Sequence, residues 1–116
     1  MQTNVLLDVE TLELIAQPLR FQLLLIIADG QACVCHFEAL LGVRQATISQ
    51  HLMRLRQAGL VTTQRSGRHV YYRLSNAQLY PALRQLAVAL GVSEQQLDAW
   101  RSAQLPGVAC PRLSVD

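Results

Sequence analysis

An amphipathic helical pattern near the middle of this 116-residue chain runs directly into two β-rich segments. The apolar face of the helix repeats every three or four positions, at Ile48, Leu52 and Leu55. Gly59 ends this pattern. Segments 60–65 and 69–74 are rich in β-branched and aromatic residues, and Ser66-Gly67 between them is a typical turn. The sequence therefore predicts a helix followed at once by a β-hairpin.

Three further helices are expected before this unit. Residues 9–16 carry apolar positions at helical spacing. A second segment, 19–28, is apolar nearly all round, which predicts a helix buried on all sides. The third runs from Cys33 to Leu41 and closes at Gly42, so that it forms a helix-turn-helix with the segment after it.

One more long helix is expected after the hairpin, with an apolar stripe at Leu79, Leu83, Leu86 and Leu90. Ser93 and Gln96 resemble a capping box that opens a final helix through Trp100. The predicted fold is a winged helix-turn-helix, mainly α with a β-hairpin wing, in the order α-α-α-α-β-β-α. It forms one domain over residues 1–104 with an irregular tail over 105–116. A homodimer through the first and C-terminal helices is expected, because so small a chain gains core by pairing.

Positive charge is concentrated on the helix-turn-helix and the hairpin. Six arginines and no acidic residue lie from Arg44 to Arg73, although the formal net charge of the chain is only +2. Such a block is typical of a surface that binds a polyanion such as DNA, and the alternative is a solvated basic face. The longest apolar run, 23–28, is too short to span a bilayer, and residues 1–8 lack the layout of a signal peptide. A cytoplasmic protein with no membrane partner is therefore expected.

The stretch from Leu40 to Leu74, LLGVRQATISQHLMRLRQAGLVTTQRSGRHVYYRL, resembles the ArsR/SmtB family of metal-sensing repressors. The resemblance implies double-stranded operator DNA as partner and a recognition helix in the major groove, with six residues facing DNA: Gln45, Ala46, Thr47, Ser49, Gln50 and His51. Arginines of this helix and of the wing are expected at phosphates: Arg44, Arg54, Arg65, Arg68 and Arg73. Arg44 departs from the family, in which a serine commonly caps this helix. His51 and His69 also have a simpler interpretation as polar surface residues.

The segment ACVCHFEAL resembles the arsenic-responsive branch of that family, which carries a similar Cys-Val-Cys before the recognition helix. Soft thiolates at Cys33 and Cys35 favour trivalent arsenic or antimony as inducer over cadmium, lead or copper(I). A methylated trivalent arsenical is a further alternative, and no permanent cofactor is expected. Glu38 stands where that branch often has a third cysteine, so Cys110 is the candidate third ligand. Two thiolates alone would fit a methylated arsenical. His36 is a further candidate ligand, with a helix-surface histidine as the simpler interpretation.

Residues i and i+2 of an α-helix lie about 200° apart, so two thiolates at that spacing cannot face one ion while the segment stays helical. Ion binding at Cys33 and Cys35 is therefore expected to unwind the start of their helix. That helix packs on the recognition helix, which predicts release of DNA.

The sequence is also compatible with other functions. The same cysteines could form a redox switch in a DNA-binding repressor, or serve as small apolar fillers. A thiol oxidoreductase is disfavoured because no parallel βαβ pattern surrounds the pair, so the chain is not expected to be an enzyme. A winged helix that binds protein instead of DNA would leave the arginine block unexplained.

Overall fold

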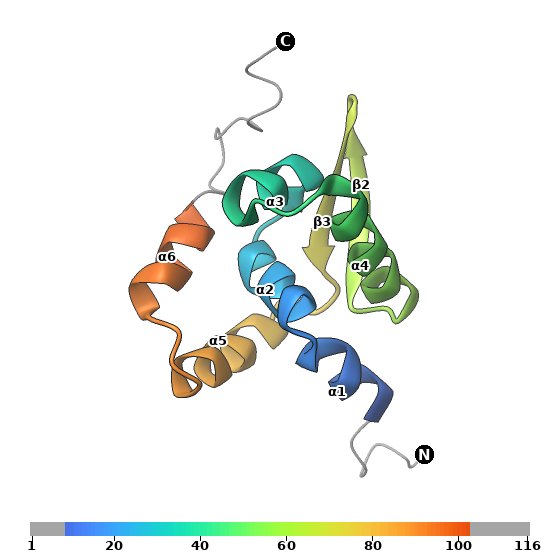
Figure 1. The fold of residues 1–116 in the computed structure, drawn as a ribbon. Coiled ribbons are helices and arrows are strands. Elements are labelled where there is room, and N and C mark those ends of the chain that lie inside the picture. The colour runs from blue at the N-terminus through green and yellow to red at the C-terminus, as the bar shows by residue number, and fades with distance from the viewer. Residues whose placement is uncertain (1–8, 103–116) are drawn as a thin grey trace.

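The computed structural model describes residues 9–102 of the chain. Helices and strands follow one another as α1 (Val9–Ala16), α2 (Pro18–Ile27), β1 (Ala32–Cys33), α3 (Val34–Leu41), α4 (Gln45–Gln57), β2 (Val61–Ser66), β3 (His69–Leu74), α5 (Leu79–Ala89) and α6 (Glu94–Ser102) (Figure 1). The predicted winged helix-turn-helix is confirmed, including the final short helix. One element was not predicted, the short strand β1. The predicted tail, 105–116, lies outside the described residues.

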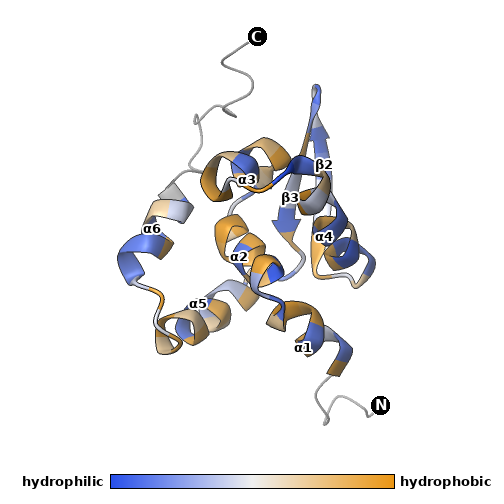
Figure 2. Ribbon diagram, in the orientation of Figure 1, coloured by the Kyte–Doolittle hydropathy of each residue, from blue (hydrophilic) through white to orange (hydrophobic). Residues whose placement is uncertain are grey.

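Helix α2 forms the centre of the core. Its residues from Leu23 to Ile27, with Ala28 just after it, are at most 1% exposed, and Figure 2 shows the helix as hydrophobic along most of its length. Helices α1, α4, α5 and α6 all contact it. A helix that is apolar all round is stable only when neighbours cover every side, which is what these four helices do.

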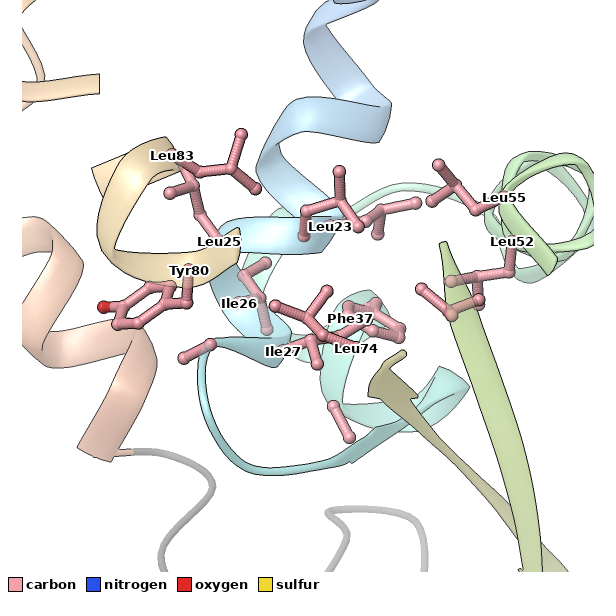
Figure 3. Close-up of a cluster of buried hydrophobic side chains, with 14 of the residues drawn as sticks. Leu23, Leu25, Ile26, Ile27, Phe37, Leu52, Leu55, Leu74, Tyr80 and Leu83 are labelled. Atoms are coloured by element: carbon pink, nitrogen blue, oxygen red, sulfur yellow. The ribbon is translucent and has the colours of Figure 1, made fainter. Parts of the chain in front are cut away.

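Side chains from the other elements complete the core around α2 (Figure 3). Phe37 of α3 and the α4 stripe of Ile48, Leu52 and Leu55 are fully buried, which confirms the apolar face predicted for α4. Gly42 then turns the chain from α3 into α4 with φ of 67°, and its N–H donates to Glu38 O at 2.8 Å. Glycine adopts this left-handed backbone without strain, which explains the tight turn.

The strands form one antiparallel sheet in the order β1-β3-β2. In the hairpin, Ser66 lies opposite His69. On the other side of β3, Ala32 lies opposite Tyr72 and Cys33 opposite Tyr71. The residue just before α3 is therefore attached by backbone pairing to the wing.

Exposed apolar residues are found on the two helices expected to form a dimer seam: Val9 and Leu12 of α1, Leu86 and Val88 of α5, and Leu90 just after it. Exposed apolar patches are typical of protein interfaces. Dimerisation stays a prediction at this point. Within residues 9–102, the helices lack the length and the apolar character that a membrane crossing requires.

Candidate functional site

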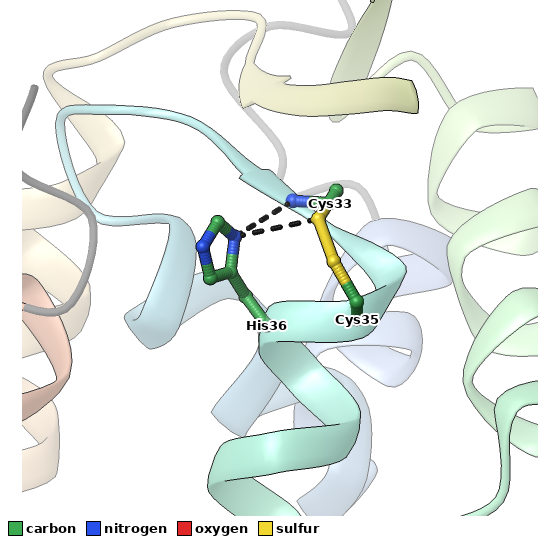
Figure 4. The surroundings of a disulfide bond; sticks show 3 residues. All are labelled: Cys33, Cys35 and His36. Carbon is green, nitrogen blue, oxygen red and sulfur yellow. Dashed lines mark hydrogen bonds between the residues drawn. A yellow bond between two sulfur atoms is a disulfide. The ribbon is translucent and has the colours of Figure 1, made fainter. Parts of the chain in front are cut away.

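Cys33 and Cys35 meet where β1 turns into α3. Cys33 is extended, with φ of −99° and ψ of 168°, and precedes the first helical residue, Val34. Its Cα lies 5.4 Å from that of Cys35, and the two sulfur atoms are joined as a disulfide (Figure 4). Both side chains are buried. The helix was expected to begin at Cys33 and is in fact one residue shorter.

That one-residue difference changes the predicted mechanism. The angle of about 200° separates residues i and i+2 only when both are helical. Because Cys33 is in the extended conformation, its side chain reaches the sulfur of Cys35 while α3 keeps its hydrogen bonds. The predicted unwinding of the helix start is therefore not needed to bring the two sulfurs together.

His36 is buried against this pair, and the expectation of a helix-surface histidine was wrong. The backbone N–H of Cys33 donates to His36 Nδ1 at 3.3 Å, and the same nitrogen lies 3.5 Å from the Cys33 sulfur. This is the reciprocal arrangement of a capping box, in which the third helical residue reaches back to the N-cap. The lone pair of Nδ1 is therefore engaged in capping α3.

A histidine of the wing lies close to the two sulfurs. One ring nitrogen of His69 and the sulfurs of Cys33 and Cys35 lie within 4.8 Å of one another. A pocket of about 360 Å³ adjoins them, bounded also by Glu38 and by Gln45 at the start of α4. The sequence assigned His69 to the polar surface. The missing information was the β1–β3 pairing, since a strand of two residues has no periodicity to detect.

Tyr71 and Tyr72 are neighbours in β3, so their side chains face opposite sides of the strand. Tyr71 packs against the cysteine pair, whereas Tyr72 packs against the main core, and both are half-buried. The rings of His69 and Tyr71 are 6.5 Å apart, as expected for residues two positions apart on one face of a strand. The face of β3 that carries His69 and Tyr71 therefore lies against the cysteine pair.

Most of the residues predicted to face DNA lie on the outer side of α4 and on the wing. Gln45, Ala46 and Gln50 are exposed, and Thr47 and Ser49 are half-buried. The five arginines expected at phosphates are all exposed: Arg44, Arg54, Arg65, Arg68 and Arg73. Helix α4 contacts β2, so that the recognition helix and the hairpin are neighbours (Figure 1). Cys110, the candidate third thiol, lies outside the described residues.

His51, one of the predicted DNA-facing residues, is hydrogen-bonded to a buried arginine. Its ring is half-buried, and its Nδ1 accepts a hydrogen bond of 3.0 Å from Nη1 of Arg20. Arg20 is 8% exposed and also donates from Nε to the carbonyl of Leu14 at 2.7 Å. The arginine thus links α1, α2 and the recognition helix. The sequence held a signal for it, since an arginine inside an otherwise apolar helix needs a buried partner.

The environment of His51 predicts a pH-dependent stability. Burial, followed by the positive charges of Arg20 and Arg54, lowers the pKa of His51 below its usual 6.5. The unfolded chain therefore takes up this proton at a higher pH than the folded chain, so folding stability should fall as pH drops below about 6.5. His51→Gln keeps an acceptor for Arg20 without a titrating ring. Urea unfolding at about pH 7.5 and pH 5.5 should show a smaller loss for the variant than for the wild type. Equal losses would contradict this role of His51.

The chain is similar in sequence to known bacterial transcriptional regulators. The family described as bacterial regulatory protein, arsR family, matches residues 17–63. The HTH-type transcriptional repressor SmtB of Mycobacterium tuberculosis is 43% identical over 70 residues, which are 60% of this chain and 52% of that protein. The chain thus spans about half the length of this relative.

Two other relatives extend the comparison. The HTH-type transcriptional regulator KmtR of Mycobacterium tuberculosis is 34% identical over 109 residues, 94% of this chain and 74% of that protein. The arsenic resistance transcriptional regulator ArsR1 of Pseudomonas putida is 47% identical over 51 residues, 44% of this chain and 40% of that protein. These relatives are transcriptional regulators and not enzymes.

Solved structures with a similar fold also include a transcriptional repressor and a DNA-binding domain. HlyU from Vibrio cholerae superposes with a TM-score of 0.68 at 30% identity, covering 77% of this chain and 97% of that chain. The transcriptional repressor BigR from Xylella fastidiosa gives 0.63 at 32% identity, covering 73% and 87%. A homodimeric winged helix-turn-helix DNA-binding domain from Mycobacterium bovis gives 0.59 at 27% identity, covering 67% and 72%. Fold, matched segment and relatives agree, and the chain belongs to the ArsR family of bacterial regulatory proteins.

Proposed function

We propose that this chain is a DNA-binding transcriptional repressor that releases its operator when trivalent arsenic binds the thiolates of Cys33 and Cys35. The observation that carries the proposal is the position of the two sulfurs, side by side where β1 turns into α3. Two adjacent thiolates are the donors that a soft acceptor prefers. The Pseudomonas putida relative is named for arsenic resistance, which supports the choice of ligand.

The DNA-binding surface consists of the outer side of α4 and the hairpin. The exposed glutamines Gln45 and Gln50 of α4 can read base edges, since glutamine bonds adenine through two atoms. Exposed arginines along α4 and the wing hold phosphates and make binding dependent on salt. A homodimer through α1 and α5 presents two such surfaces to two half-sites of an operator. The Mycobacterium bovis domain is homodimeric, which supports pairing of this chain.

The position of the pair provides two connections to these DNA-binding elements. Cys33 belongs to β1, which pairs with β3 of the wing, and Cys35 belongs to α3, which packs on α4. A ligand held by both sulfurs acts on both connections at once. Inorganic arsenic takes three thiolates, for which Cys110 is the proposed third, whereas a methylated arsenical needs only two. The reducing cytoplasm would keep these thiols available.

A second candidate is a redox-responsive repressor, favoured by the bond between the two sulfurs. In this case two thiols form one disulfide and lose two protons and two electrons to hydrogen peroxide, which is reduced to two waters. Oxidation would lock β1 to the first turn of α3. Both candidates use the same pair and the same DNA-binding surface.

The test is a titration of the reduced full-length chain bound to fluorescent DNA from its own promoter. Arsenite, methylarsenite, antimonite and peroxide are added separately, and anisotropy reports DNA binding. Arsenic in at least one of its forms is expected to weaken binding about 5–150-fold, a typical coupling between two sites. Release by peroxide alone would overturn the proposal in favour of the redox switch. Failure of the reduced chain to bind this DNA would overturn both.

A further inference from the structure

We propose that His69 of the wing is a third ligand of the cysteine site and makes it a Cys₂His site for a borderline divalent cation, zinc or cadmium. This inference rests on the proposed function in taking Cys33 and Cys35 as the sensing residues. It adds a third ligand, which lies on strand β3, and a different class of ion.

The sheet brings His69 to the pair. Cys33 lies opposite Tyr71 in the β1–β3 ladder, and His69 precedes Tyr71 by two residues on the same strand. Side chains two positions apart share one face of a strand, and diagonal neighbours across a ladder remain within reach of each other. The ring nitrogen accordingly lies within 4.8 Å of both sulfurs.

The spacing of the three atoms suits a tetrahedral cation after a small adjustment. With metal–sulfur bonds of about 2.3 Å and metal–nitrogen bonds of about 2.0 Å, ligand atoms of a tetrahedral site lie about 3.5–3.8 Å apart. Reduction of the disulfide frees both sulfurs to separate to that distance. The imidazole then has to approach by roughly 1 Å, a movement within the range of side-chain rotation.

The chemistry of the three ligands determines the class of ion. An all-sulfur site selects soft acceptors, whereas imidazole suits zinc and related borderline ions. Two thiolates and a neutral imidazole also balance the charge of a divalent cation. Both cysteines are buried and His69 is half-buried, and all three line the pocket described above. A water in this pocket, or the nearby Glu38, can therefore take the fourth position on the ion.

The second histidine near the pair is a less suitable ligand. His36 Nδ1 accepts the backbone N–H of Cys33 and caps α3, so metal binding through that nitrogen would remove a cap. His69 lies on the wing, outside α3. An ion held by His69 and both cysteines would join the wing to the start of α3 through side chains, in addition to the backbone pairing of β1 with β3.

The experiment measures cadmium binding to the reduced full-length chain through the ultraviolet absorbance of the thiolate–cadmium bond, in competition with a chelator. His69→Gln is expected to lower cadmium affinity by more than about tenfold, since even loss of a residue that only orients a ligand costs 10–100-fold. Gln64→Ala is the matched control, because Gln64 is exposed on the neighbouring strand opposite Tyr71. X-ray absorption of the zinc-loaded wild type is expected to show sulfur and nitrogen neighbours.

The outcomes separate this inference from the proposed function. Equal cadmium affinity in His69→Gln, Gln64→Ala and the wild type would overturn the inference, as would a larger loss in His36→Gln than in His69→Gln. Arsenite release in His69→Gln should persist, because arsenic is held by sulfur. A wild type that binds cadmium through His69 but keeps its DNA in the presence of every arsenic species would leave the inference standing and overturn the proposed function.

Discussion

Replacing Cys33 and Cys35 together with serine is expected to leave operator binding of the reduced chain nearly unchanged and to abolish release by arsenite. Serine has nearly the shape of cysteine but offers a hard oxygen that stays protonated at neutral pH, so it does not replace a soft thiolate. Neither cysteine lies on the exposed side of α4 or among the wing arginines. Anisotropy of labelled DNA across an arsenite titration measures both properties in one experiment.

The matched control is Val34→Ala, which alters the half-buried residue between the two cysteines without removing a thiol. It should release DNA at wild-type arsenite concentrations. Thermal unfolding of the serine variant establishes that it remains folded. Release of DNA from the double serine variant at wild-type arsenite concentrations would contradict the assignment of the sensor to this pair. Cys110→Ser then distinguishes a three-thiolate from a two-thiolate site, because only the former loses its response to inorganic arsenite.

The elements predicted best from the sequence are those whose stability depends on residues close to them in the chain. The stripe of Ile48, Leu52 and Leu55 repeats with the period of a helix, and the hairpin contains its own turn. Both are confirmed. Such periodicity is local, and a window of a dozen residues contains all of it.

The geometry of the cysteine site was predicted less well because it depends on contacts distant in sequence. Strand β1 has two residues and exists only through pairing with Tyr71 and Tyr72 of β3. No local pattern marks such a strand. This pairing holds Cys33 in the extended conformation, shortens α3 by one residue and brings His69 to the sulfurs. A shift of one residue at a helix start is within the usual uncertainty of helix boundaries, yet here it removes the need for unwinding.

Histidines illustrate the same limit. His36, His51 and His69 all carry a polar ring, and the simplest interpretation of each from the sequence was a surface residue. The structure gives them separate environments: a cap on α3, an acceptor for Arg20, and a neighbour of the cysteine pair. Which environment a histidine meets depends on tertiary packing, and its pKa and ligand behaviour follow from that environment.

Phe37→Ala is expected to lower the free energy of unfolding by about 3–5 kcal/mol, the usual cost of truncating a buried aromatic residue. Phe37 is 0% exposed and packs in the core cluster with α2, two residues after Cys35. It therefore fixes the helix that carries Cys35, one of the two proposed sensing residues. A loss of this size is a large fraction of the roughly 5–15 kcal/mol that stabilises a typical domain. Urea unfolding followed by circular dichroism provides the measurement.

The matched control is Phe37→Leu, which keeps most of the buried carbon and should cost markedly less than the alanine variant. Both variants are compared at one protein concentration and without DNA, because pairing of subunits and DNA binding each stabilise the folded state by mass action. A loss below about 0.5 kcal/mol for Phe37→Ala would contradict the role of this ring, since that is the range of surface substitutions. With a loss in the expected range, α3 is anchored through Phe37, and a ligand on Cys35 acts on a helix fixed to the core. Movement would then pass more readily to the wing, through Cys33 and β1, than to α4 through α3.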